Sequence, residues 1–131
     1  MTKEDVKKNI KPVFERYEGT IVFAYLFGST ARDATAPLSD IDIAVFFEKG
    51  DAESYFEAKI SLYADLCRAL KTNKVDLVVL NTATNLLLMD EIIRTGIVFA
   101  DSAPETRLDF ELDVLHRSLD FRSHRLAVMG V

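Results

Sequence analysis

The chain has 131 residues, of which 49% are hydrophobic and 28% are charged. This balance is typical of a globular protein and excludes a disordered or fibrous chain, and the length suffices for one domain with a real core. The formal net charge of −5 argues against binding of extended nucleic acid, which depends on lysine and arginine contacts to phosphates. We therefore expect a single domain over residues 1–131.

The only cysteine is Cys67, so an internal disulfide is impossible and a cytoplasmic location is expected. The first residues lack the apolar segment of a signal peptide. The longest apolar run, residues 21–27, is too short to span a bilayer. We expect no membrane association.

The first predicted element is a helix with apolar residues at helical spacing. Thr2 and Asp5 are spaced as a capping pair, and Gly19 is a plausible stop. Pro12 predicts a kink or an interruption within this helix. Residues 20–27 follow as a continuous apolar run, which predicts a strand covered on both faces.

Gly28 ends this strand, and Ser29 is expected to cap a short helix that continues through Arg32. Residues 40–47 predict a second strand. Gly50-Asp51 should end this strand and cap a helix that runs to about residue 70. We expect its buried stripe to consist of Phe56, Ile60, Tyr63, Cys67 and Leu70, with Leu62 and Leu66 beside it.

A third apolar strand is predicted over residues 74–80, again covered on both faces. Residues 86–94 should form a helix that ends at Gly96, and residues 97–100 a short strand. Pro104 suits the first turn of a last helix that runs toward residue 127. This order of elements implies a small α/β or α+β domain with a central sheet.

Acidic residues occur at unusual places in two of these strands. Asp40 and Asp42 are two apart on a strand, so both carboxylates should point the same way and repel unless a cation lies between them. Asp76 lies within the third strand, where a lone carboxylate is costly to bury unless it is paired or bound to metal. If the strands are neighbours, three carboxylates form a cradle for magnesium. An acidic pair alone is a weak signal, and only the combination carries this prediction.

The Gly28-Ser29 turn joins a strand to a helix start, where backbone N–H groups suit phosphate. Arg32, one turn later, is placed to reach phosphate oxygens. The turn is not a P-loop, because no Gly-Lys-Ser/Thr follows Gly28 at the required spacing. A phosphate-binding turn beside an acidic metal site is typical of phosphoryl or nucleotidyl transfer.

The last helix carries a wide apolar arc. One interpretation is that the whole arc packs on the sheet, and the other is that part of it binds a partner protein. One stripe of the arc consists of Leu108, Leu112, Leu115, Leu119 and Leu126, and the second of Phe110, Val114, Phe121 and Val128.

Four segments of the chain resemble the minimal nucleotidyltransferases, or MNT proteins, of the polymerase-beta-like nucleotidyltransferase superfamily. Residues 28–33 and 39–45, Gly-Ser-Thr-Ala-Arg-Asp and Ser-Asp-Ile-Asp-Ile-Ala-Val, look like the family signature. Residues 75–78 look like its third acidic strand, and residues 90–99 are similar to its late helix and strand. The resemblance implies the polymerase-beta-like fold, with a small central mixed sheet flanked by helices.

The resemblance also implies magnesium-dependent transfer of AMP from ATP to an acceptor. Asp40 and Asp42 would hold two Mg²⁺ ions, and Asp76 would complete the site at the acceptor hydroxyl and help to take its proton. Gly28, Ser29 and Arg32 would hold the triphosphate. One position departs from the family pattern, which usually has Gly where this chain has Asp33.

Many members of this family are antitoxins of HEPN-type RNase toxins, and some inactivate the toxin by adding AMP to a tyrosine. The leading hypothesis is therefore a protein AMP-transferase with a HEPN-type partner. A small-molecule nucleotidyltransferase similar to the aminoglycoside-modifying enzymes and a non-catalytic antitoxin that acts by contact alone are the alternatives. A template-directed polymerase is disfavoured by size and charge. The acceptor, the base preference and the oligomeric state stay open, and a homo-oligomer is compatible with the sequence.

Overall fold

The computed structural model describes residues 2–31 and 40–128, with side chains described up to residue 121. The order of helices and strands is the one predicted from the sequence. The elements are α1 (Lys3–Arg16), β1 (Ile21–Phe27), α2 (Gly28–Ala31), β2 (Ile41–Phe47), α3 (Ala52–Leu70), β3 (Val75–Val79), α4 (Leu86–Thr95), β4 (Ile97–Asp101) and α5 (Pro104–Val128).

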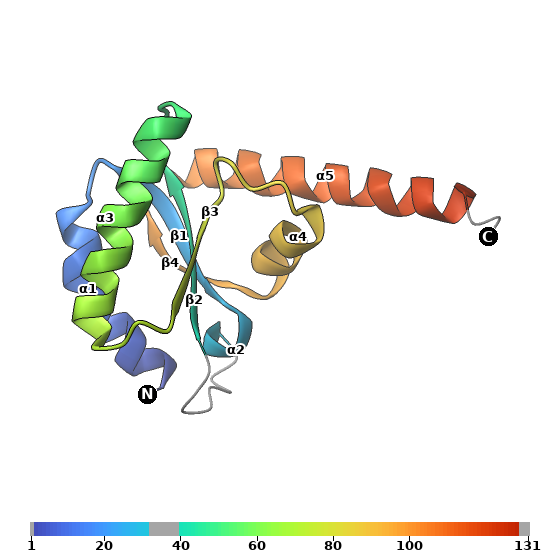
Figure 1. Cartoon of the computed structure of the whole chain (residues 1–131). Coiled ribbons are helices and arrows are strands. Elements are labelled where there is room, and N and C mark those ends of the chain that lie inside the picture. Colours follow the sequence, from blue (N-terminus) through green and yellow to red (C-terminus); the bar gives the residue numbers. More distant parts are fainter. Residues whose placement is uncertain (1, 32–39, 129–131) are drawn as a thin grey trace.

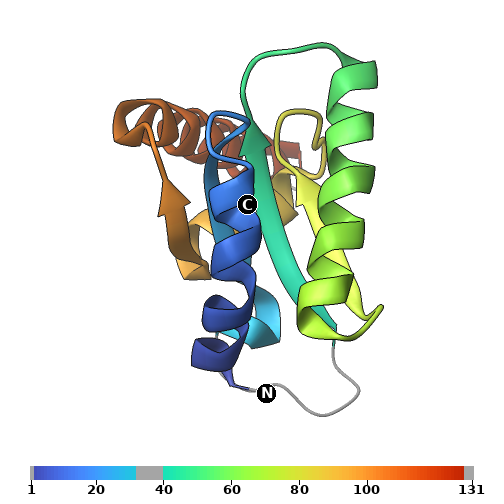
Figure 2. The same ribbon diagram turned by 90° about the vertical axis from the view of Figure 1, so that its left-hand side faces the viewer.

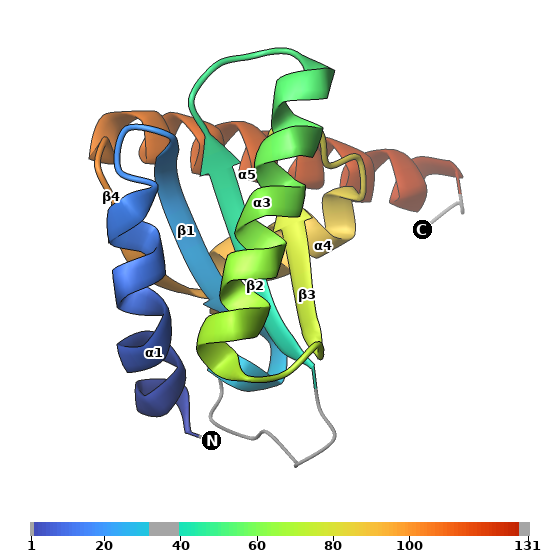
Figure 3. The same ribbon diagram turned by 60° about the vertical axis from the view of Figure 1, so that its left-hand side comes forward.

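The strands form one four-stranded mixed sheet in the order β3-β2-β1-β4. β1 pairs with both β2 and β4 in the antiparallel sense, whereas β2 and β3 are parallel. The parallel pair is joined through α3, because parallel neighbours need a long crossover. β3 and β4 are therefore the two edge strands, and β1 and β2 lie inside the sheet (Figure 3).

Helices cover both faces of the sheet. Figures 2 and 3 show α1 and α3 side by side on one face, with α4 and α5 behind the other. Two hydrophobic clusters correspond to these two layers, and β1 contributes to both. Every residue of β1 is buried, which confirms the prediction of a strand covered on both faces.

The start of α1 is fixed by the predicted capping pair. The Asp5 N–H donates to Thr2 Oγ1 at 3.2 Å, and the Thr2 N–H donates to Asp5 Oδ2 at 2.9 Å. α1 continues through Pro12, so the expected interruption does not occur. Pro12 has no N–H to donate to the Lys8 carbonyl. Both residues face solvent, so water can hydrate that carbonyl.

The buried face of α3 differs from the predicted one. Leu62, Leu66 and Leu70 are buried against the sheet, whereas Phe56 and Ile60 are 64% and 53% exposed. The three leucines recur every four residues and form a single buried stripe, with Tyr63 and Cys67 partly buried beside it. The prediction that Phe56 and Ile60 belong to the core is therefore wrong.

The expectation that the third strand is covered on both faces is also wrong. In β3 the odd-numbered residues are buried with α1 and α3, but Asp76 is exposed and Val78 is half-buried. The reason is the position of β3 at the edge of the sheet, where the second face is only partly covered. Asp76 is therefore not the buried carboxylate that the sequence suggested.

The first half of α5 is held against the sheet by polar contacts. The Tyr25 hydroxyl of β1 donates to Glu111 Oε2 at 2.7 Å. Arg107 donates to Asp101 Oδ2 at 2.7 Å and to Glu111 Oε1 at 3.1 Å. Burial, and then the Glu111 carboxylate, raise the pKa of Tyr25, so the phenol stays protonated. Beyond these contacts α5 extends past the body of the protein (Figure 1).

No helix in the described ranges is both long and apolar enough to cross a membrane.

Candidate functional site

Two of the predicted acids meet across the parallel strand pair. Asp42 of β2 and Asp76 of β3 are direct register partners. Side chains at register partners of neighbouring strands point to the same face of a sheet, so both carboxylates lie on one face. The condition set from the sequence, that the two acidic strands are neighbours, is therefore met.

The Asp42 carboxylate also lies against the turn that follows β1. Gly28 has a φ of +62°, and a Cβ at this position would overlap with Asp42 Oδ2. Only glycine combines the left-handed backbone with the space that this carboxylate needs. The Asp42 N–H donates to Thr30 Oγ1 at 3.3 Å, and Thr30 is buried, so α2 is tied to the start of β2.

The glycine-serine turn differs in one detail from the prediction. α2 begins at Gly28, two residues earlier than expected from a cap at Ser29, so Ser29 lies within the helix and is not its cap. Ser29 is half-buried. Arg32 and Asp33, the predicted phosphate ligand and the departure from the family pattern, lie outside the described residues.

Asp40 is exposed and comes directly before β2. The pKa of the Tyr63 phenol on α3 is raised, chiefly by its hydrogen bond with the Cys67 thiol and more weakly by the charge of Asp40. The Asp40 carboxylate is thus within electrostatic range of α3.

The donor chemistry suits magnesium, although the full predicted cluster is not found. Asp42 and Asp76 supply carboxylate oxygens on one face, which are the ligands that Mg²⁺ prefers. Among the described side chains, residues 2–31 and 40–121, no three His, Cys, Asp or Glu lie together as a metal-binding group. The assignment of Asp40, Asp42 and Asp76 as metal ligands therefore stays a prediction.

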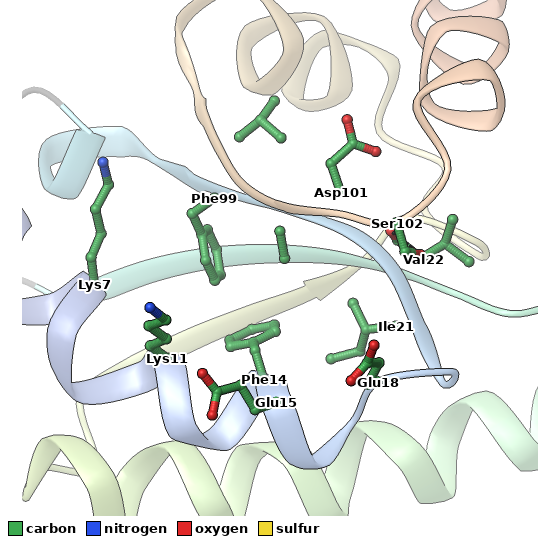
Figure 4. A pocket seen from close by; sticks show the side chains of 12 residues that line it. Lys7, Lys11, Phe14, Glu15, Glu18, Ile21, Val22, Phe99, Asp101 and Ser102 are labelled. Carbon is green, nitrogen blue, oxygen red and sulfur yellow. Dashed lines mark hydrogen bonds between the residues drawn. The ribbon is translucent and has the colours of Figure 1, made fainter.

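Two grooves flank the sheet, one at each edge. A groove of about 520 Å³ follows the outer edge of β3 and is lined by Asp76 and by Phe56 and Lys59 of α3. A larger groove of about 770 Å³ lies between α1 and β4 (Figure 4). Its centre is apolar, with the rings of Phe14 and Phe99 packed edge to face at 4.6 Å. None of the predicted site residues that the structure describes lines the larger groove.

Sequence reasoning missed two features of the site. The Thr30 hydroxyl, which holds the Asp42 backbone, is two residues beyond Gly28, and its polar side chain on the buried side of a short helix was the available signal. The groove along β3 was missed because it depends on β3 being an edge strand and on Phe56 being exposed, and both are properties of the packed fold.

A family model described as polymerase beta, nucleotidyltransferase matches residues 8–105. This range contains Gly28, Asp40, Asp42 and Asp76. A comparison with curated protein sequences gives no match.

Several solved structures are similar over almost the whole chain. One is a chain in the crystal structure of a toxin-antitoxin with AMP-PNP, which is 25% identical with a TM-score of 0.74, and the match covers 95% of both chains. Another is the toxin-antitoxin MntA-HepT, at 23% identity and a TM-score of 0.68, covering 95% of this chain and 94% of that one. A third is a tri-AMPylated Shewanella oneidensis HEPN toxin in complex with MNT antitoxin, at 22% identity and a TM-score of 0.70, covering 98% and 97%. These likenesses confirm the predicted fold.

Proposed function

Because the chain belongs to the polymerase beta nucleotidyltransferase family, we propose that it transfers AMP from ATP to a protein and acts as the antitoxin of a HEPN-type toxin. The observation that carries the proposal is the meeting of Asp42 with Asp76 in one register position, with the Asp42 carboxylate against Gly28. An acidic pair beside a turn that allows close backbone approach is what nucleotidyl transfer needs.

In this proposal Asp40, Asp42 and Asp76 hold magnesium, and the backbone of Gly28 and Ser29 holds the triphosphate. Bound Mg²⁺ supplies charge neutralisation for the attacking and leaving oxygens. The acceptor hydroxyl oxygen attacks the α-phosphorus of ATP, the bond from that phosphorus to the bridging oxygen breaks, and pyrophosphate leaves. The hydroxyl proton passes to Asp76, which is exposed and therefore accessible to an acceptor.

The choice of AMP and of a HEPN-type acceptor is supported by the similar structures. One of them is a toxin-antitoxin with AMP-PNP, and another contains an AMPylated HEPN toxin with its MNT antitoxin. The match covers more than nine-tenths of each of these chains. This chain is therefore long enough to carry out the same reaction with the same kind of partner.

The exposed face of α5 supports a protein partner. Leu108, Leu112 and Leu119 are 50%, 54% and 54% exposed and recur at the spacing of one helical stripe. Exposed leucines in such a row are typical of a protein interface. We expect Leu112→Lys with Leu119→Lys to weaken the complex with the HEPN-type protein at least tenfold, measured by calorimetry, with the unfolding midpoint unchanged. Unchanged affinity would remove α5 from the interface.

The decisive experiment follows label from α-³²P-ATP with magnesium and a HEPN-type protein encoded beside this chain. The wild type should label the partner, and Asp42→Asn should reduce the rate by about a hundredfold or more, because a lost metal ligand costs several kcal/mol in the transition state. Glu48→Gln is the matched control, since it removes an exposed carboxylate just after the opposite end of β2.

Equal labelling by wild type and Asp42→Asn would refute the site. Tight binding of the partner without labelling by the wild type would instead favour an antitoxin that acts by contact alone. Labelling of aminoglycosides but not of the protein would favour the small-molecule transferase.

A further inference from the structure

The groove on the outer edge of β3 opens next to the proposed catalytic acid. It has a volume of about 520 Å³ and is lined by residues 76–79 of the strand and by Tyr55, Phe56 and Lys59 of α3. Thr82 and Ala83, just after the strand, also line it. Asp76 is one of the lining residues, so the groove reaches the strand position that carries the proposed catalytic acid.

The backbone of β3 offers open hydrogen-bonding groups on this side. The Leu80 N–H donates to the Val45 carbonyl at 2.8 Å, so it faces β2. The Lys74 carbonyl accepts from the Ile41 N–H at 2.9 Å and faces β2 as well. The backbone N–H and C=O groups of successive residues point to opposite edges of a strand. Those of the even-numbered residues of β3 therefore point toward β2, and those of the odd-numbered residues point away from the sheet. In the described part of the chain, no strand pairs with the outward side.

The wall that α3 presents to the groove is apolar with one positive charge. The ring of Phe56 is largely exposed. Tyr55 is fixed, because its hydroxyl accepts from the Gly50 N–H at 2.9 Å and its ring stacks on Phe47. Lys59 is half-buried, and among the described side chains no carboxylate forms an ion pair with it. Such a wall fits an apolar side chain next to a carboxylate.

We propose that an extended segment of the acceptor protein binds along β3 as an added strand, which places its hydroxyl residue at Asp76. The inference rests on the proposed function and names its acceptor-binding surface. Successive side chains of a strand point to opposite faces. The odd-numbered side chains of β3 pack toward α3, and Asp76 lies on the other face.

This geometry assigns positions within the acceptor segment. A hydroxyl residue that faces Asp76 has its immediate neighbours, and the residues three positions away, on the α3 side. There an apolar residue covers Phe56 and an acidic residue pairs with Lys59. Recognition should therefore occur at odd offsets from the modified residue.

The first test uses a library of tyrosine-containing peptides with randomised neighbours, incubated with this protein, magnesium and labelled ATP. The wild type should enrich Asp or Glu at one odd offset from the modified tyrosine. Lys59→Glu should invert this preference to Lys or Arg and reduce labelling of the best wild-type peptide about tenfold, because attraction becomes repulsion. Lys11→Glu, which changes a lysine of the groove at β4, is the matched control and should preserve the wild-type preference.

A preference at even offsets, or an acidic preference that survives Lys59→Glu, would overturn the added strand while leaving the proposed function standing. A second readout needs no catalysis. In a complex of Asp42→Asn with the HEPN-type protein, hydrogen exchange of the backbone N–H groups at residues 75, 77 and 79 should slow at least tenfold. A formed complex without this protection would also overturn the inference, whereas protection without any labelling by the wild type would contradict only the proposed transfer.

Discussion

The two edge strands of the sheet are similar in form, but the acidic residue on each has different contacts. β3 and β4 each have five residues, and a groove lies beside each of them. At β4 the acid, Asp101, binds Arg107 at 2.7 Å and so holds the start of α5. At β3 the Asp76 carboxylate has no hydrogen-bond or ion-pair partner among the described residues, and Asp76 is the register partner of Asp42.

The site that we propose lies beside the smaller of the two grooves, so groove size alone did not guide the assignment. The larger groove is lined by Phe14 and Phe99, whose rings pack against each other, and its acid is already engaged in the structure. The smaller groove contains an acid that the fold does not use. If this distinction holds, changes near Asp42 and Asp76 should alter transfer more than stability, and changes near β4 should alter stability more than transfer.

The largest effect should follow Gly28→Ala. The added Cβ would overlap with Asp42 Oδ2, and a left-handed φ of +62° costs a non-glycine residue about 1–2 kcal/mol. The carboxylate must move, so we expect the rate of AMP transfer to fall about a hundredfold. The measurements are label transfer and urea unfolding.

Gly19→Ala is the matched control for this change. Gly19 also has a left-handed φ, +87°, but nothing lies within 4 Å of an added Cβ. It should lose a similar amount of stability and retain transfer. Equal losses of transfer in both variants would mean that backbone strain, and not the position of Asp42, limits the activity.

A smaller effect, confined to stability, is expected from Tyr25→Phe. The variant removes a hydrogen bond from a buried phenol to the Glu111 carboxylate. Hydrogen bonds to charged groups contribute about 1.5–3 kcal/mol, so the free energy of unfolding should fall by roughly that amount in urea titrations. Transfer by the folded protein should be unchanged. A loss of transfer as large as that of Gly28→Ala would show that the β4 side also positions the site.

The smallest effect on stability is expected from a change between α1 and α3, the two helices that cover one face of the sheet. The pKa of Asp65 on α3 is lowered, first by the hydrogen bond from the Tyr17 hydroxyl at 2.7 Å. A carboxyl with a lowered folded-state pKa stabilises the protein above its unfolded value, near 3.8, and loses this stabilisation as pH falls through the lower folded value.

Tyr17→Phe should therefore reduce the dependence of unfolding free energy on pH in the range below about 4. Urea titrations near neutral pH and in that acidic range measure this change. Because α1 borders the groove at β4 and α3 borders the groove at β3, the variant should weaken both edges alike. A selective change in transfer would contradict this expectation.

The elements of this fold were predictable where the pattern is local. The continuous apolar run of β1, the capping pair at Thr2 and Asp5, and the cap at Asp51 each depend on residues close in sequence. The pairing of Asp42 with Asp76 was predicted only conditionally, because strand adjacency is a long-range property.

The errors have a common physical origin. Phe56 and Leu62 are both large apolar residues, and only the packed sheet decides which of them is covered. Likewise, β3 reads as a strand covered on both faces because Val78 is apolar, although only its odd-numbered residues are buried. The hydrophobic periodicity of a sequence indicates the faces of a helix or strand but not which elements pack against them. The groove along β3 could therefore not be predicted from it.

The register of β3 against β2 limits which sequence changes this protein tolerates. A slip by one residue would turn Asp76 into the core and expose Leu77, because the side-chain period of a strand is two. The same register that keeps Leu77 in the core also keeps Asp76 beside Asp42. Selection for a stable fold and selection for the position of the acid therefore act on the same residues. Insertions or deletions before β3, in residues 71–74, should therefore be rare among proteins related to this sequence.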